Sequence, residues 1–281
     1  MKKKSSSHFS FRPSSWITAL CLGIGIGITS QRIPELRAYT NQVVQPIEQQ
    51  VFTHQYTQES RFSGQPISSF HINRPGYSLA YDARNRNPAW VYEHLTAESI
   101  KGDTDRSHSD FKEDDSIPPH LRATLTDYRG SGFDRGHMAP AADHRSSPSA
   151  MADTFFMTNM CPQCPELNRG YWSKLEKHVR DLTKQYANIH VVTGPLYLPY
   201  TDVDGKRYVK YQVLGSNRVA VPTHFFKVLT LDKGHGQALT IAYILPNEPV
   251  PSNTPLEKFQ TSVQKVEQAA GILFNPANNK F

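Results

Sequence analysis

The sequence predicts a mixed α+β fold built around one folded body. Alternating, β-rich runs such as YSLAY, AWVYEHL, VAVPTHFFKVLTL and ALTIAYIL indicate strands, whereas residues 171–187 and 257–271 have the composition and spacing of helices. At 281 residues and 38% apolar content, the chain can bury one sizeable core. A second domain is therefore not required, and we find no internal repeat.

The N-terminal segment, residues 1–37, is basic and hydrophobic. Nineteen uncharged residues lie between Arg12 and Arg32, and a helix of that length, at about 1.5 Å per residue, would barely span a bilayer. No acidic residue precedes Glu35. This pattern fits a mitochondrial targeting sequence or a membrane anchor, and it also fits a secretory signal. We expect the segment to contact a membrane or an import machinery, with secretion or a periplasmic location as the alternative.

The remaining chain divides into a linker and the folded body. Residues 38–60 are polar and rich in Gln, which predicts a linker, and the body then occupies residues 61–281. Within the body, the acidic stretch GDTDRSHSDFKEDDS at 102–116 has like charges that repel and little to bury. We expect that stretch to be a solvated loop.

The positive net charge belongs mostly to the N-terminal segment. The chain carries +6, but residues 1–37 hold six basic side chains against one acidic one, so the rest is only +1. Any nucleic-acid binding must therefore depend on a local cluster rather than on net charge. Such a cluster surrounds the sequence DRGH at 134–137, and its members are Arg129, Arg135, Arg145, Arg169, Lys174, Lys177 and Arg180.

The most informative residues lie within about 45 positions of one another, beginning at Asp134-Arg135-Gly136-His137. Cleavage of a phosphate ester needs a base that titrates near the working pH, which makes His137 the candidate. It also needs positive charge at the phosphate, which Arg135 and a hard divalent cation can supply. Together these side chains predict phosphodiester chemistry.

The metal part of this prediction depends on helical spacing. Asn168, Trp172, Glu176 and Arg180 follow one another at intervals of four, so a helix here would place them on one face. Asn168 could then give its amide oxygen to Mg²⁺, and Glu176 could hold one of the waters that Mg²⁺ retains. Taken singly, Asn168 is also a good N-cap, and Glu176 with Arg180 is also an ordinary surface ion pair.

Two other functional classes compete with a metal-dependent nuclease. Cys161 and Cys164 form a C-x-x-C pair, which is compatible with a thiol-redox site or with half of a zinc site. No second C-x-x-C exists, and the pair lies in a Pro-flanked segment rather than at the start of a helix. The other class is a membrane-tethered nucleic-acid-binding protein without catalysis, which the presence of His137, Asn168 and Glu176 disfavours.

Six blocks of the chain resemble the DNA/RNA non-specific endonucleases, in the order in which that family has them. They are SGFDRGHMAPAADHR, TFFMTNMCPQ, LNRGYWSKLE, VVTGPLYLP, DGKRYVKYQVLG and VAVPTHFFKVL, and the resemblance covers roughly residues 60–275. It implies a ββα-metal (His-Me finger) nuclease fold with a central antiparallel sheet flanked by helices. It also implies a homodimer in the mitochondrial intermembrane space that cleaves DNA and RNA with Mg²⁺, or with Mn²⁺ as a substitute.

The resemblance assigns a role to each matching residue. His137 would be the general base, and Arg135 would bind the phosphate or stabilise its charge. Asn168 would be the sole direct protein ligand of the metal, and Glu176 would orient a metal-bound water. We expect this arrangement to give products with 5′-phosphate and 3′-hydroxyl ends.

Further positions are implied with less detailed roles. Asn159 would lie near the scissile phosphate, and Arg169 and Arg180 would contact the nucleic acid. Arg180 and Glu267 fall on positions that matter for activity in the family. The blocks HMAPAADHR and LNRGYW lean towards exonuclease-like members, so the balance of endonuclease and exonuclease activity stays open.

Overall fold

The computed structural model describes residue 67 and residues 69–232 and 238–274. The predicted targeting segment (1–37) and the linker (38–60) lie outside the described residues. Within the described part of the chain, no helix has the length and apolar character needed to cross a bilayer.

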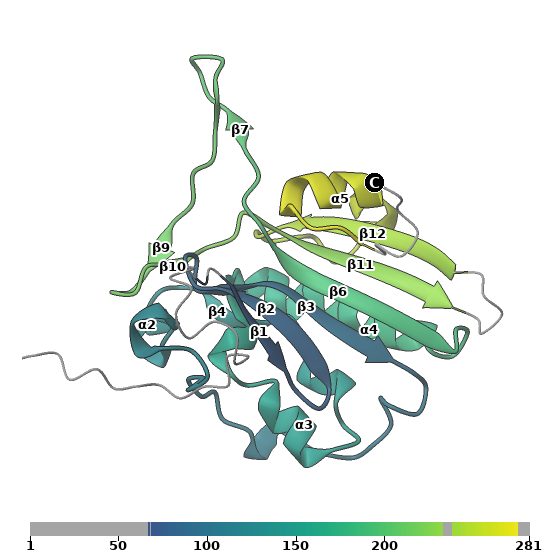
Figure 1. Ribbon diagram of the computed structural model, residues 1–281. Coiled ribbons are helices and arrows are strands. Elements are labelled where there is room, and N and C mark those ends of the chain that lie inside the picture. The colour runs from purple at the N-terminus through teal and green to yellow at the C-terminus, as the bar shows by residue number, and fades with distance from the viewer. Residues whose placement is uncertain (1–66, 68, 233–237, 275–281) are drawn as a thin grey trace, which may run out of the picture. The chain divides into compact units, whose positions relative to one another are not determined.

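A seven-stranded antiparallel sheet forms the centre of the body, as expected (Figure 1). Its strand order is β1-β2-β3-β6-β11-β12-β13, and long β6 and β11 pair along their whole length. The strands are β1 (Ser69–Asn73), β2 (Tyr77–Asp82), β3 (Asn87–Leu95), β6 (Asn188–Leu196), β11 (His224–Asp232), β12 (Ala238–Pro246) and β13 (Gln260–Thr261).

Helices cover both faces of this sheet. Neighbouring side chains of β11 point to opposite faces because a strand alternates with period two. Phe225 and Leu229 belong to the core cluster that contains Leu175 of α4 (Ser173–Leu182), whereas Phe226 belongs to the cluster that contains Val266 of α5 (Val263–Ala270). The sheet is therefore packed between α4 on one side and α5 on the other (Figure 1).

The two predicted helices differ from the structure at their ends. Residues 171–187 give α4, which ends at Leu182 and is preceded by a π-helical turn, η6 (Leu167–Trp172). Residues 257–271 divide into η7 (Leu256–Phe259), strand β13 and α5, because β13 pairs with β12 before Ser262 caps the new helix. Gly271, in the left-handed conformation that favours glycine, ends α5.

A second layer, on the α4 side of the sheet, carries the first three of the six blocks that resemble the family. β4 (Asp134–His137) pairs antiparallel with β5 (Met160–Gln163), and η6 and α4 follow β5, so these segments form a ββα unit. Short helical segments complete the layer: η2 (Arg106–His108), η3 (Pro119–Leu121), α2 (Leu125–Tyr128), η4 (Ala141–Asp143), α3 (Pro148–Asp153) and η5 (Met157–Asn159).

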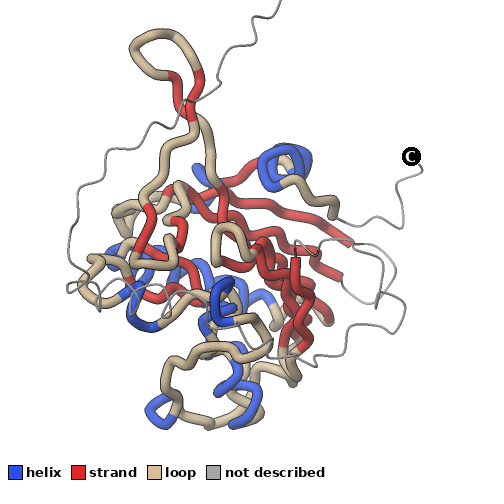
Figure 2. The backbone as a smooth tube through the Cα atoms, turned by 60° about the vertical axis from the view of Figure 1, so that its left-hand side comes forward, coloured by secondary structure: helices blue, strands red, loops and turns tan. Residues whose placement is uncertain are grey.

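Residues 200–213 form an arm that projects from the body (Figures 1 and 2). The arm contains the two-residue strands β7 (Tyr200–Thr201) and β8 (Arg207–Tyr208) and returns to the body at β9 (Val213–Leu214), which pairs with β10 (Val219–Ala220). Six of the nine large hydrophobic side chains that are exposed in the described residues belong to the arm, and Val203 at its tip is fully exposed.

Candidate active site

A cavity of about 750 Å³ lies where β4, η6 and α4 meet. Its wall contains most of the residues that the sequence singled out, together with several that it did not. The expected residues in the wall are Arg135, His137, Arg145, Asn168, Arg169, Glu176 and Arg180. The structure thus brings the predicted base, the predicted metal ligand and four arginines to one pocket.

His137 is the last residue of β4 and is held between aromatic rings. The Phe155 ring lies 4.9 Å away, edge to face, and the Phe111 ring lies 5.6 Å away. Its Nε2 atom is buried and has no hydrogen-bond partner in the described residues. Burial, with smaller contributions from Arg106 and His144, lowers the pKa of His137 to about 3. The imidazole is therefore neutral at physiological pH, which is the form that can accept a proton.

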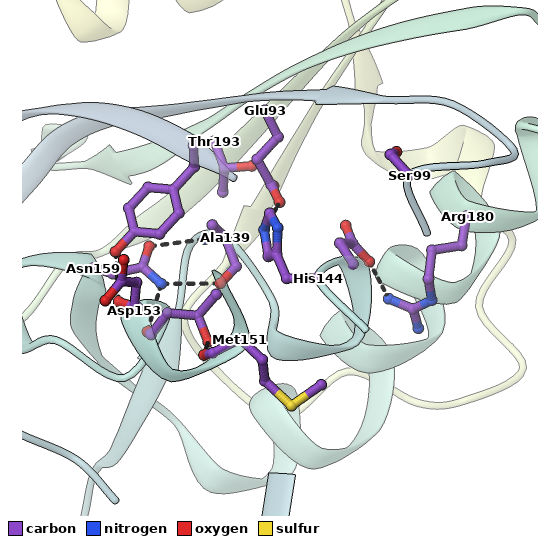
Figure 3. A network of polar contacts seen from close by, with 12 residues as sticks. Glu93, Ser99, Ala139, His144, Met151, Asp153, Asn159, Arg180 and Thr193 are labelled. Carbon is purple, nitrogen blue, oxygen red and sulfur yellow. Dashed lines mark hydrogen bonds and ion pairs between the residues drawn. The ribbon is translucent and has the colours of Figure 1, made fainter. Parts of the chain in front are cut away.

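Asn159, which the resemblance places near the scissile phosphate, is not among the residues that line the pocket. Its side chain is fully buried. The Oδ1 atom accepts from the Ala139 amide, and Nδ2 donates to the carbonyls of Ala139 and Thr154, at 2.8–2.9 Å (Figure 3). Both the oxygen and the nitrogen of the side-chain amide are thus hydrogen-bonded to the backbone. Asn159 therefore fixes the backbone just after His137 rather than contacting the substrate.

Arg135 lies in the same strand as His137, one residue before Gly136. Its guanidinium carbon is 4.8 Å from the centre of the Phe111 ring, and its buried Nε atom has no hydrogen-bond partner in the described residues. A buried N–H without a partner is costly. An anion that entered the pocket would satisfy it, so the geometry of Arg135 fits a phosphate-binding role.

The π-turn of η6 changes which residues of the following helix face the pocket. Asn168, Ser173, Glu176 and Arg180 line it, but Trp172 does not. The prediction that Trp172 shares their face is wrong, because a π-turn bonds residue i to i+5 and therefore places Ser173, five residues on, in line with Asn168. Trp172 is instead fully buried against the Phe225 ring of the sheet.

Asp134 orients Asn168 and was not assigned a role from the sequence, although it is part of DRGH. Its Oδ2 atom accepts a hydrogen bond of 2.8 Å from Asn168 Nδ2, and both of its oxygens accept from Arg169 at 2.6–2.8 Å. Burial opposes ionisation, but the hydrogen bonds from Arg169 and Asn168 outweigh it and lower the pKa of Asp134. Since Nδ2 is engaged, the amide oxygen of Asn168 is the atom left to bind a cation.

The residues present fit a single hard cation. Glu176 is placed two turns after Asn168, and burial raises its pKa to about 8, so its carboxylate would be stabilised by a positive charge nearby. The described residues contain no cluster of three or more His, Cys, Asp or Glu side chains that could hold a metal. One amide oxygen and one carboxyl group suit Mg²⁺, which keeps several of its own waters, and do not suit zinc.

Arg180 pairs with a residue other than Glu176. Its Nη1 atom lies 2.7 Å from Oδ1 of the buried Asp143, which is the last residue of η4. The ordinary surface ion pair with Glu176 that the sequence allowed is therefore not the main contact of Arg180. Asp143 holds the guanidinium in the wall of the pocket.

The acidic stretch 102–116 is not simply a solvated loop. Arg106 and Phe111 line the pocket, and Asp114 is buried, where it accepts hydrogen bonds from Arg74 and Thr158. The expectation failed because the partners of Asp114 lie 40 and 44 positions away in the chain. Apart from Arg106, the residues of this stretch gave no indication in the sequence that it is more than a solvated loop.

The other expected residues lie away from the pocket. Of the predicted basic cluster, Lys177 pairs with Asp181, and Lys174 donates to a backbone carbonyl. Arg129 does not line the cavity either. Glu267 accepts a hydrogen bond from the Phe274 amide beyond the end of α5, which is a structural contact.

Cys161 and Cys164 are both buried and are not joined by a disulfide. Cys161 lies in the hydrophobic core, where burial raises the pKa of its thiol well above the usual value. The Cys164 thiol donates to the Glu166 carboxylate at 3.0 Å. Neither thiol has the depressed pKa of a reactive cysteine, so the redox and zinc alternatives are not favoured.

Comparison with known proteins agrees with the geometry of the pocket. The family model for DNA/RNA non-specific endonucleases matches residues 57–281. Human mitochondrial endonuclease G is 54% identical over 204 residues, which are 73% of this chain and 69% of the relative. Nuclease C1 of Cunninghamella echinulata var. echinulata is 48% identical over 206 residues, which are 72% of this chain and 81% of the relative.

A solved structure also matches. A chain of the crystal structure of the EndoG/EndoGI complex superposes with a TM-score of 0.72 at 48% identity, covering 75% of this chain and 87% of that one. The fold and the sequence blocks therefore match the same family. The chain belongs to the DNA/RNA non-specific endonuclease family and is a nuclease with the ββα-metal fold.

Proposed function

We propose that this nuclease hydrolyses phosphodiester bonds in DNA and RNA with a single divalent cation, Mg²⁺ or Mn²⁺. The proposal is carried by one observation: a neutral His137 and Asn168 line the same pocket. Asp134 accepts a hydrogen bond from the amide nitrogen of Asn168, which leaves the amide oxygen available to a cation. In-line hydrolysis of a phosphodiester is helped by a base that activates water and by a cation at the phosphate. Here the base lies on β4 and the cation ligand lies on η6 of the same ββα unit.

The base is held in one orientation. His137 lines the pocket with its ring neutral, and it would take the proton of the attacking water. The edge-to-face contact with Phe155 fixes the plane of the ring. The hydrogen bonds of Asn159 fix the backbone that follows it, so the base is held before substrate binds.

The arginines balance the charge that grows on the phosphate. Arg135, with its unpartnered Nε, and Arg180, held by Asp143, both line the pocket and present planar donor groups that suit phosphate oxygens. Arg169 lies at the exposed rim and would contact the backbone of the nucleic acid. A substrate affinity that falls steeply with salt would support this assignment.

The cation would be held by the Asn168 oxygen, with Glu176 orienting its water shell. When bound there, it would supply Lewis-acid stabilisation of negative charge on the phosphate and on the departing oxygen. We expect departure of the 3′-oxygen, which leaves 5′-phosphate and 3′-hydroxyl ends. End-labelling of the products checks this, and 3′-phosphate termini would contradict it.

A plasmid-nicking assay tests the metal assignment. Wild-type protein should nick supercoiled DNA in Mg²⁺, and EDTA should abolish the reaction. Asn168→Ala should be inactive at the same metal concentration, whereas Asn253→Ala, which changes an exposed Asn far along the chain, should be active. Nicking that survives both EDTA and Asn168→Ala would rule out the single-metal proposal.

A mitochondrial location is supported by the composition of residues 1–37 and by the matching relatives whose names place them in mitochondria. We propose the intermembrane space, with residues 1–37 acting on import or at the inner membrane, residues 38–60 as linker and residues 61–281 as the nuclease domain. Protease protection of the tagged full-length chain in intact and in swollen mitochondria tests this. Periplasmic or secreted protein would support the alternative location.

A homodimer is supported by the exposed apolar side chains of the arm. Val203, Val209 and Val213 are aliphatic and exposed in the arm, a composition that suits a protein partner more than nucleic acid. Light scattering of the wild type should give twice the chain mass. Val203→Asp with Val209→Asp should shift the mass towards that of a monomer, and an unchanged dimer would show that the interface lies elsewhere.

A further inference from the structure

A buried group of charged side chains lies directly behind the pocket wall. Glu93 on β3 is 1% exposed, Asp143 is 3% exposed and Lys227 on β11 is 1% exposed. His144 Nε2 donates to Oε1 of Glu93 at 3.0 Å (Figure 3). Arg180 pairs with Asp143 at 2.7 Å. Charges are rarely buried to this degree unless they are paired, because removal from water is costly.

Only one of these pairs reaches the pocket. Arg180 lines the cavity and retains about a fifth of its side-chain exposure, whereas Asp143 has almost none. The Lys227 ammonium is already bonded to Thr193 at 2.6 Å, and His144 to Glu93. Asp143 therefore serves Arg180, and Arg180 is the member of the group that can meet a substrate.

The surroundings of Asp143 are built to keep this pair in place. Gly76 leaves the space that the His144 ring occupies, since a Cβ at residue 76 would lie 2.2 Å from His144 Nδ1. The ring in turn is bonded to Glu93 (Figure 3). Because His144 directly follows Asp143 in the chain, the fixed ring restrains the backbone of Asp143, whose carboxylate gives Arg180 one direction in which to extend.

We propose that Asp143 is a positioning residue for hydrolysis, which holds the Arg180 guanidinium where the phosphate charge develops. The inference rests on the proposed function, in which Arg180 contacts the phosphate. A guanidinium stabilises a transition state best when it is oriented before the reaction begins. The buried ion pair with Asp143 orients the Arg180 guanidinium. Asp143 does not touch the substrate and acts only through Arg180.

The pair also gives the rate a pH dependence. Burial and the Glu93 carboxylate raise the pKa of Asp143 to about 6, against the opposing effect of Arg180. The other charged groups that face it are Glu176 on α4, Lys227 on β11 and His144. Burial lowers the pKa of His144, but the hydrogen bond to Glu93 outweighs burial and raises it. Asp143 is ionised above about pH 6, so Arg180 is held above that pH and released below it.

The test compares Asp143→Asn and Asp143→Ala in the wild type and in an Arg180→Ala background. In the full-length protein at pH 7.5 and saturating Mg²⁺, Asp143→Ala should lower kcat by about 10–10²-fold, the cost of a misplaced group, with a smaller change in KM. In Arg180→Ala, the same change should have no further effect, because the residue it positions is absent.

Asp143→Asn imitates the protonated carboxyl at every pH. Its kcat should equal the low-pH rate of the wild type and should lack the fall near pH 6 that the wild type shows. Asp114→Asn is the matched control, since Asp114 is 2% exposed and pairs with Arg74 at 2.7 Å outside the pocket. It should lower the melting temperature without altering the pH profile of kcat.

The outcomes separate this inference from the proposed function. Full activity of Arg180→Ala would remove Arg180 from the reaction and overturn this inference, whereas metal-dependent hydrolysis that requires His137 and Asn168 would stand. If Arg180→Ala is impaired but Asp143→Ala impairs the enzyme further in that background, Asp143 has a structural role and only this inference is overturned. A pH profile of Asp143→Asn that matches the wild type would overturn it as well.

Discussion

Removal of the Asp134 carboxylate should weaken cation binding without removing any direct ligand. Asp134 accepts the hydrogen bond of Asn168 Nδ2 at 2.8 Å, so the Asn168 amide has one preferred direction. In Asp134→Ala the amide is free to turn and can present its NH₂ group to the cation. The protein then binds the metal only in the fraction of molecules that retain the correct rotamer.

The size of the effect follows from this single contact. A hydrogen bond to a charged partner contributes about 1.5–3 kcal/mol. Loss of an outer-shell partner typically lowers metal affinity by about 10–100-fold, or about 1.4–2.7 kcal/mol, and the two estimates agree. The Mg²⁺ concentration for half-maximal nicking should therefore rise by about 10–100-fold, and the rate at saturating Mg²⁺ should recover to near the wild-type value.

The assay is an initial-rate titration of plasmid nicking with Mg²⁺. Arg169→Ala is the control, because it removes the other partner of Asp134 while it leaves the bond to Asn168. Since the Arg169 side chain is 73% exposed, its loss should change the salt dependence more than the metal dependence. An unchanged half-saturation in Asp134→Ala, or a loss of rate that Mg²⁺ does not restore, would refute the reasoning.

Three further outcomes follow from the site. His137→Ala should lower kcat by about 10²–10⁴-fold, the usual contribution of a general base, with an unchanged circular-dichroism spectrum; a wild-type rate would exclude it. Between pH 6.5 and the folded pKa of about 3, the unfolded chain binds a proton at His137 that the folded chain does not, so acidification destabilises the fold by at most about 1.4 kcal/mol per pH unit. The free energy of unfolding, measured with urea, should depend less steeply on pH in that window for His137→Phe than for the wild type. Equal slopes for the two proteins would contradict the shifted pKa. Asn159→Ala should strand the amide of Ala139 and lower stability by about 2–5 kcal/mol, because several buried bonds are lost; an unaltered melting temperature would show that water replaces them.

The chemistry of the pocket was largely predictable because its main residues are close in sequence. His137 and Arg135 share one short strand, and Asn168 and Glu176 share one helical run. Residue type and spacing are sufficient for such local groups, since a strand and a helix each fix the direction of their side chains. The strand runs of the sheet were predictable from their length and β-rich composition, and β11, which is buried on both faces, is one of them.

The remaining residues depend on contacts that sequence spacing does not contain. Asp134 gains its role from a bond to a residue 34 positions away, and Asp143 from one 37 positions away. Asn159 occurs beside an expected motif, yet its bonds turn inward to Ala139. In the stretch 102–116, buried Asp114 depends on distant Arg74, so its charge alone gave the wrong expectation. A run of like charges predicts a solvated segment only where no oppositely charged residue from a distant part of the chain pairs with it.

The π-turn of η6 explains why the metal ligand and the core anchor can be neighbours. A regular α-helix would place Asn168, Trp172 and Glu176 on one face, so either Trp172 would enter the polar pocket or Asn168 would enter the core. The wider turn places Ser173 in line with Asn168 and lets Trp172 pack on Phe225, while Glu176 keeps its place in the pocket. A π-turn is less stable than an α-turn and persists only when packing favours it. The burial of Trp172 therefore stabilises the turn, and through that turn the hydrophobic core sets the direction of the metal ligand.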